Sequence, residues 1–156
     1  MTEDPIYRDL MNYAMRALSR RAHTSFELRE KLKKRSNHTP QLEDQVLSRL
    51  QDLNLINDEA YVRHAIEEAT RYKLQGRYKL ASRLQQKGID FKETETLWKE
   101  AEISERELAA EALKRAAKRF AKVPPEKLYQ RRASFLASRG FSPEIIFELA
   151  KTGERS

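Results

Sequence analysis

The sequence predicts an all-α protein made of three tandem three-helix repeats of about 52 residues, which form an elongated curved array. Apolar residues recur with helical spacing, and 4 glycines and 5 prolines in 156 residues leave few positions for β-turns. In addition, a leucine, a basic residue and a small residue recur together every 52 positions. The equivalent residues are Leu32, Leu84 and Leu136; Arg35, Lys87 and Arg139; and Ser36, Gly88 and Gly140.

The first repeat, residues 1–57, is predicted to contain three helices. The first of them places its apolar side chains on a single face. Thr24, with Glu27 three residues later, is the pattern of a capping box and predicts the start of the second helix. Thr39 and Pro40 are typical of an N-cap and a first-turn proline, so they open the third. The expected spans are about residues 6–20, 24–37 and 39–54.

The second repeat, residues 58–103, is predicted to begin at an N-cap formed by Asn57 or Asp58. Gly76 is expected to break its first helix, because glycine disfavours helix interiors. A second helix then ends at Gly88, a residue type suited to the left-handed conformation that follows many helices. A third helix completes the repeat.

The third repeat, residues 104–156, is predicted to open with a second capping box, formed by Ser104 and Glu107. Its first helix is expected to extend to Phe120. Two consecutive prolines separate this helix from the next one, which ends at Gly140. The last helix is capped by Ser142, which precedes a first-turn proline.

Basic residues gather at equivalent places in the three repeats, near the end of each first helix and along each second helix. One interpretation is a set of solvated helix faces, since the helix dipole favours cations near C-termini. The other is a basic band that binds a protein partner or a nucleic acid. The predicted binding residues are Lys31, Lys33, Lys34, Arg35, Arg71, Lys73, Arg77, Lys79, Arg83, Lys87, Lys114, Arg115, Lys118 and Arg119.

Two tyrosines, Tyr72 and Tyr78, alternate with these cations in a pattern typical of stacking on nucleic-acid bases. For Tyr78 we nevertheless expect packing between helices, because Phe26 is its equivalent in the first repeat. Trp98 is expected in the core. Surface or capping roles are expected for His23, His38 and His64.

No pattern in the chain indicates catalysis: it has no phosphate-binding loop, nucleophilic triad or metal motif, so we expect no enzyme activity, cofactor, metal or small-molecule substrate. The net charge of +7 favours an acidic partner. The absence of cysteine fits a reducing cytosol, and no segment has the ~18 consecutive apolar residues of a membrane span. We therefore expect a cytoplasmic monomer that contacts no membrane.

Five segments resemble, in order and spacing, motifs of the bacterial regulatory protein RecX family. They are residues 14–21 (AMRALSRR), 25–32 (SFELREKL), 50–61 (LQDLNLINDEAY), 76–90 (GRYKLASRLQQKGID) and 135–146 (FLASRGFSPEII). The resemblance covers about residues 6–150. Asn54 and Asn57 stand where the family tends to have glycine and aspartate, but asparagine also suits a helix terminus and an N-cap. The proline that often follows the glycine at position 76 in the family is missing here.

The resemblance implies an all-α protein that binds the recombinase RecA along the groove of its filament on single-stranded DNA. It also implies restraint of the ATPase, strand-exchange and coprotease activities of RecA, in homologous recombination, DNA repair and the SOS response. The alternative from the residues themselves is a basic helical protein that binds DNA directly through its repeats, with an affinity that falls steeply with salt. A third possibility is a helical scaffold for another acidic partner.

Overall fold

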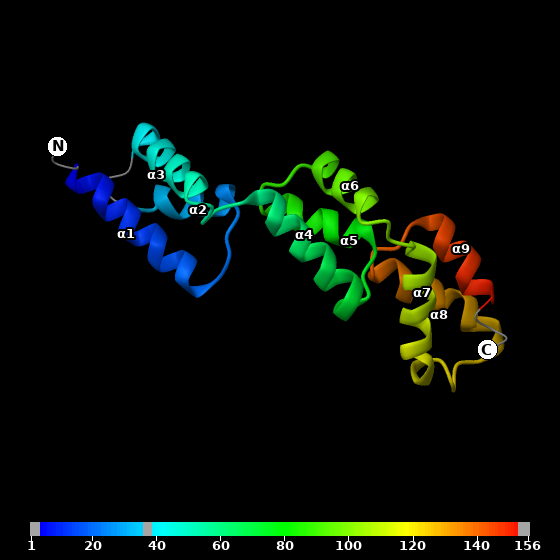
Figure 1. Cartoon of the computed structure of the whole chain (residues 1–156). Helices are drawn as coiled ribbons and strands as arrows, with labels where there is room; N and C mark the ends of the chain where they lie inside the picture. Colours follow the sequence, from blue (N-terminus) through cyan, green and yellow to red (C-terminus); the bar gives the residue numbers. More distant parts are fainter. Residues whose placement is uncertain (1–3, 36–38, 153–156) are drawn as a thin grey trace. The chain divides into compact units, whose positions relative to one another are not determined.

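The computed structural model describes residues 4–35 and 39–152, and every regular element in these two ranges is helical (Figure 1). The α-helices follow one another in threes, which confirms the all-α class and the three tandem three-helix repeats. They are α1 (Pro5–Arg20), α2 (Ser25–Lys33), α3 (Pro40–Asp52), α4 (Asp58–Glu68), α5 (Arg77–Gln86), α6 (Phe91–Glu100), α7 (Glu105–Arg115), α8 (Pro125–Ser138) and α9 (Pro143–Thr152). Across the same two ranges, no helix combines the length and apolar character needed to cross a membrane.

The chain forms two compact units. The first extends to Val62 and includes Lys87–Ile89, and the second contains Arg63–Gln86 and the residues from Asp90 onward. In the first unit α1, α2 and α3 pack on one another, and in the second α7, α8 and α9 do so. The repeat boundaries expected after residues 57 and 103 stay predictions.

The N-caps read from the sequence begin the helices in the structure. Thr24 forms the predicted capping box: its hydroxyl accepts from the Glu27 N–H at 3.1 Å, and its own N–H donates to the Glu27 carboxylate at 3.1 Å. The Thr39 hydroxyl caps α3, and Ser104 accepts from the N–H of Glu107 at 3.2 Å at the start of α7. Each cap satisfies an N–H that has no partner inside its own helix.

The leucines that define the 52-residue period lie in the core, as the period predicts. Leu32, Leu84 and Leu136 have 0%, 1% and 0% of their surface exposed, and Trp98 is also buried. In the first unit, one apolar cluster contains Leu10, Ala14, Ala17, Leu28, Leu32, Val46, Leu47, Leu50 and Ile56. Burial of these side chains is the main force that holds each small unit together.

Two helices end earlier in the structure than the sequence predicts. The predicted extension of the first helix of the third repeat to Phe120 is wrong, because α7 ends at Arg115 and a single 3₁₀ turn, Ala117–Arg119, follows. The N–H of Ala116 is shared between two carbonyls, which tightens the end of the helix. Helix α2 ends at Lys33, and the expected end at Asn37 lies outside the described residues.

The end of α4 has a feature that the sequence did not predict. The helix continues into a π-helical turn, Ala69–Lys73, and Leu74 then adopts a left-handed conformation with φ of 50°. The N–H groups of Leu74 and Gln75 both donate to the carbonyl of Ala69. π-Helical turns are rare, and a left-handed conformation is strained for a bulky residue such as leucine.

Within the second unit, the start of α5 contacts the end of α8 through main-chain atoms. The Gly76 N–H donates to the Arg139 carbonyl at 2.7 Å, and the Tyr78 N–H donates to the Gly140 carbonyl at 3.1 Å. Gly76 and Gly140 approach so closely that a Cβ on Gly76 would lie 2.5 Å from the Gly140 oxygen. Gly140 also has φ of 85°, a conformation that glycine adopts without strain. This contact is called the glycine junction below.

Candidate binding surface

The cations at the end of α2 lie in the first unit, and three of them contact neighbouring polar groups. Arg35 pairs with Asp9 at 3.1 Å, and its guanidinium lies 4.7 Å from the centroid of the Tyr13 ring. The Lys31 ammonium lies 2.8 Å from Nε2 of His23. Lys33 and Lys34 are exposed, and Lys33 pairs with the exposed Glu30 at 3.2 Å.

In the second unit, the predicted cations around α5 divide into bound and exposed ones. Arg77 pairs with Glu95 at 2.8 Å and approaches Glu105, at the start of α7, to 3.9 Å. Arg83 donates to the side-chain oxygen of Gln75 at 3.0 Å. These contacts support the fold, so neither cation is well suited to a partner. Arg71, Lys73 and Lys79 are exposed, although Arg71 pairs with Glu67 at 3.2 Å and the Lys79 ammonium donates to the Ser138 carbonyl at 3.2 Å.

Lys87 is bound in a polar cluster at the start of α2, in the first unit. Its ammonium lies 3.1 Å from the Glu27 carboxylate, which also pairs with Arg21 at 3.1 Å, and its carbonyl accepts from the Thr24 hydroxyl at 2.7 Å. Burial alone would raise the pKa of Glu27. Hydrogen bonds from Arg21, the Thr24 N–H and Lys87 outweigh burial and lower the pKa to about 2.

Replacing Glu27 by glutamine is expected to lower the free energy of unfolding at neutral pH by about 1–2 kcal/mol, because three hydrogen bonds to a charged acceptor become weaker. The pKa in the folded state, about 2, lies below the usual 4.5, so the stabilisation is complete above pH 4.5 and is lost as the pH falls toward 2. Denaturant unfolding between about pH 7 and pH 2 measures both effects.

The matched control is Glu30→Gln, which removes an exposed pair with Lys33 in the same helix. The two glutamine variants differ in the pH range below about 5, where the loss of stability on acidification should shrink only for Glu27→Gln. An equal pH dependence in both variants would show that Glu27 is not a stabilising carboxylate.

The expectation of a surface position is wrong for His23, which is 3% exposed just after the end of α1. Its Nδ1 lies 2.9 Å from the Arg21 carbonyl, and Lys31 approaches its other ring nitrogen. Burial lowers the pKa of His23, and the charges of Arg21 and Lys31 lower it further. This burial could not be predicted from the apolar periodicity, because no apolar period includes position 23. His64 is exposed, and His38 lies outside the described residues.

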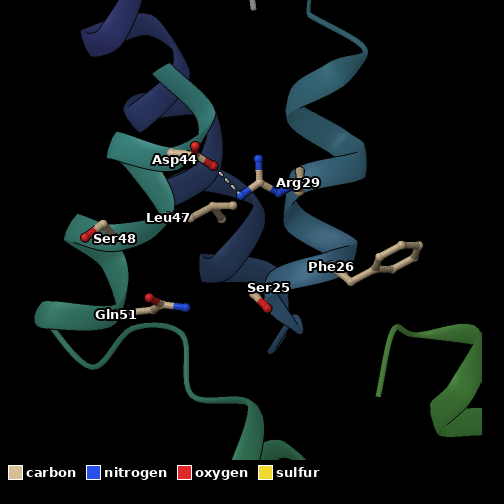
Figure 2. Close-up of a pocket in the computed structure, with 7 residues that line it drawn as sticks. All are labelled: Ser25, Phe26, Arg29, Asp44, Leu47, Ser48 and Gln51. Carbon is tan, nitrogen blue, oxygen red and sulfur yellow. Dashed lines mark hydrogen bonds and ion pairs between the residues drawn. The ribbon is translucent and has the colours of Figure 1, made fainter. Parts of the chain in front are cut away.

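A cleft of about 440 Å³ lies between α2 and α3, and Figure 2 shows its lining. Arg29 points across the cleft to Asp44, with which it pairs at 2.6 Å, and it also pairs with the buried Glu43 at 3.4 Å. The cation is therefore neutralised by two carboxylates, so the cleft has no excess charge that favours an anion. The lining residues are Ser25, Phe26, Arg29, Asp44, Leu47, Ser48 and Gln51.

The expectation that Tyr78 and Phe26 pack between helices is wrong, since 49% and 47% of their surfaces are exposed. Phe26 lies against Gly88, where a Cβ would come within 2.2 Å of the phenylalanine Cβ. In Figure 2 its ring points away from Asp44. Tyr78 is partly covered by the guanidinium of Arg77, which is 5.0 Å from the ring centroid. Equivalent positions in the repeats are thus both at the surface.

A second cleft, of about 290 Å³, is strongly basic and lies in the second unit. It brings together Arg115, Lys118 and Arg119 from the predicted band with Arg139, which the prediction omitted, and its lining contains no carboxylate. Lys114 is exposed but does not line the cleft. The complete lining is Tyr72, Leu74, Ala112, Arg115, Ala116, Lys118, Arg119 and Arg139. We call it the basic cleft.

Aromatic rings hold the arginines of the basic cleft in place. The guanidinium groups of Arg119 and Arg139 lie 5.2 Å and 4.9 Å from the centroid of the Phe135 ring. Phe120 packs edge-on against Phe135 at 5.7 Å, and Arg132 lies 5.9 Å from the Phe120 ring. Cation–π contacts of this kind restrict the guanidinium positions but consume few of their N–H donors.

The repeat itself contained the signal for Arg139. This residue is the equivalent of Arg35 and Lys87, which the sequence placed in the basic band, and its guanidinium donates to the Lys73 carbonyl at 2.6 Å.

A third cleft, of about 440 Å³, brings Lys79 and Arg83 of the band beside Tyr78 and the end of α8. Apart from these groupings, the described residues of the band do not converge on one site.

Sequence families support the three-helix units. The model described as "RecX, first three-helix domain" matches residues 11–50, and the model described as "RecX, third three-helix domain" matches residues 104–149. The chain is similar in fold to the crystal structure of RecX from Lactobacillus salivarius, with a TM-score of 0.82 at 22% identity over 96% of this chain and 97% of that one.

Relatives named Regulatory protein RecX match over most of the chain. The protein from Chlorobaculum tepidum is 34% identical over 152 residues, which are 94% of this chain and 90% of that protein. The protein from Chlorobium phaeobacteroides is 35% identical over 137 residues, covering 86% and 87% respectively.

Proposed function

Because this chain belongs to the RecX family of regulatory proteins, we propose that it binds the recombinase RecA and its filament on single-stranded DNA. The bound protein slows ATP hydrolysis, strand exchange and coprotease activity by RecA, and it does so through contacts rather than catalysis. The observation that carries the proposal is the similarity to relatives named Regulatory protein RecX, which extends over 94% of the chain in one of them.

The charge distribution supports an acidic partner such as a nucleoprotein filament. The chain has a net charge of +7, and the exposed cations of the basic band lie in all three repeats. Each exposed ion pair contributes only roughly 0.2–1 kcal/mol. Several such contacts on one scaffold nevertheless reinforce one another, because the first contact raises the effective concentration of the others.

The direct test measures ATP hydrolysis by RecA on single-stranded DNA while the purified full-length protein is added up to equimolar amounts. We expect the rate to fall as the protein saturates the filament. Binding to naked DNA at the same salt concentration is the control. Unchanged ATP hydrolysis together with equal affinity for bare DNA and for the filament would overturn the proposal and favour direct DNA binding instead.

Reversing the charge of Arg71, Lys73 and Lys79 to glutamate is expected to weaken inhibition about tenfold, since three exposed contacts of up to ~1 kcal/mol each are lost. Arg77 is left unchanged, because it pairs with Glu95 and Glu105 inside the fold. The concentration that halves RecA ATP hydrolysis, measured at two salt concentrations, gives the effect.

The matched control reverses Lys92, Lys99 and Lys127, which are exposed lysines outside the predicted band. Both variants change the net charge by the same amount, so a general charge effect would weaken them equally. Helix content measured by circular dichroism should be unchanged in both. Equal inhibition by the two variants would place the contact outside these cations of the second repeat.

A further inference from the structure

The basic cleft differs in charge from the cleft between α2 and α3. In the cleft between α2 and α3, Arg29 is neutralised by Asp44 and Glu43. In the basic cleft, Lys118 and Arg119 have no ion pair with any described residue, and only Arg115 is paired, with Glu111 at 3.0 Å outside the lining. A concave site with unneutralised cations attracts an anion.

The donors of the basic cleft are positioned before any ligand arrives. Arg119 and Arg139 lie on the Phe135 ring, and Arg139 is also fixed by its hydrogen bond to the Lys73 carbonyl. A guanidinium held in this way loses little conformational freedom on binding an oxyanion. Its planar array of N–H donors matches two oxygens of a phosphate group.

The rim of the cleft is formed by an aromatic ring on unusual backbone. Tyr72 is 72% exposed and lies in the π-helical turn, directly before Lys73 and the left-handed Leu74. Among the described residues no cation stacks on this ring, in contrast to Tyr78. Strained backbone and π-helical turns cluster at functional sites, and an uncovered aromatic face is a platform on which a nucleic-acid base stacks.

The volume of the cleft indicates which part of a ligand fits inside it. The space of about 290 Å³ is at the lower end of the range of roughly 300–1,000 Å³ for small-molecule sites, so it is ample for a phosphate group, and the mostly exposed Tyr72 leaves its ring accessible to a base. The base would therefore remain at the rim, where the exposed face of Tyr72 lies.

We propose that the basic cleft binds a nucleoside phosphate, with the phosphate on Lys118, Arg119 and Arg139 and the base stacked on Tyr72. The ligand is either a free nucleotide or one unit of a single strand, since both present the same phosphate and base. Lys118 and Arg119 also belong to the predicted basic band, so the test of this site uses no RecA, and its failure would leave the proposed contact with RecA standing.

The experiment titrates the full-length protein with a fluorescent five-residue oligothymidylate, with an abasic phosphodiester of the same length and with free deoxythymidine triphosphate. Tyr72→Ala is expected to weaken binding of the base-containing strand between about fivefold and a hundredfold. Tyr72→Phe keeps the ring and should bind as the unchanged protein does. Binding of the abasic strand should not depend on Tyr72.

Lys118→Ala removes an exposed cation without touching Phe135, so it tests the phosphate position without risk to the fold. It is expected to weaken the abasic and base-containing strands equally, and to reduce the slope of log affinity against log salt by about one. The matched controls are Tyr129→Ala and Lys127→Ala, which alter an exposed ring and an exposed lysine on α8 outside the cleft.

The outcomes separate the two ligand sources and the failure of the proposal. Tyr72-dependent binding of the strand but not of the triphosphate assigns the site to single-stranded nucleic acid. Tyr72-dependent binding of the triphosphate with similar affinity assigns it to free nucleotides. The proposal is overturned if Tyr72→Ala and Tyr129→Ala bind all three probes alike, or if Lys118→Ala matches Lys127→Ala.

Discussion

Replacing Leu84 by alanine is expected to lower the free energy of unfolding by about 2–5 kcal/mol. The side chain is 1% exposed in α5, so the substitution removes buried methyl groups and leaves a cavity that the surrounding helices fill only in part. A loss of this size is a large fraction of the stability of a small helical unit. Denaturant unfolding followed by circular dichroism measures it.

The control for this substitution is Gln85→Ala, which changes the adjacent, exposed residue of the same helix. Because alanine favours helix, this change should be neutral or slightly stabilising. If Leu84→Ala lowers the free energy of unfolding by less than ~0.5 kcal/mol, Leu84 is not the core residue that its equivalence with Leu32 and Leu136 predicts.

Replacing Gly76 by alanine is expected to open the glycine junction and cost about 3 kcal/mol. The new Cβ would lie 2.5 Å from the carbonyl oxygen of Gly140, and neither backbone can move away without loss of the two hydrogen bonds that join them. Overpacking costs ~1–3 kcal/mol, and each lost hydrogen bond adds ~0.5–1.5 kcal/mol.

Amide hydrogen exchange locates the effect of Gly76→Ala. We expect the N–H groups of residues 76 and 78 to lose protection, because they donate to carbonyls at the end of α8. Protection of the core amides around Leu32, in the first unit, should not change. Retained protection at both junction amides would show that the backbones accommodate a methyl group.

The features that the sequence predicted depend on local chemistry or on a repeated pattern. The capping box of Thr24 and Glu27 needs only groups three residues apart, and it forms as expected. The buried leucines could be found because three copies of the same unit place them at equal intervals. Sequence alone therefore predicted the fold class and the three-helix repeats.

Features that depend on tertiary contacts were not predictable. Nothing in the local sequence of residues 69–74 marks a π-helical turn or a left-handed leucine, since leucine usually avoids that conformation. Phe26 lies against Gly88, which is distant in sequence, and 47% of its surface is nevertheless exposed. Hydrophobicity and helical spacing carry no record of either contact.

The candidate site was predictable only in part. Charge patterning identified Arg115, Lys118 and Arg119, but whether a cation is neutralised depends on which carboxylates the fold brings near it. Arg77 lies in an equally basic stretch of sequence and yet pairs with Glu95. Tyr72 and the end of α7 likewise line one cleft because the fold brings them together, and neither segment alone indicates this.

A scan that only truncates side chains to alanine, and so passes over glycine, would overlook the main-chain hydrogen bonds of the glycine junction. The scan removes side-chain atoms, but the donors and acceptors at this contact are the peptide groups of residues 76, 78, 139 and 140. Truncating Tyr78 or Arg139 leaves the N–H of one and the carbonyl of the other in place. A mutational map based on truncated side chains would therefore not report these peptide hydrogen bonds, which join the second and third repeats. Substitutions that add atoms at the glycines would reveal them.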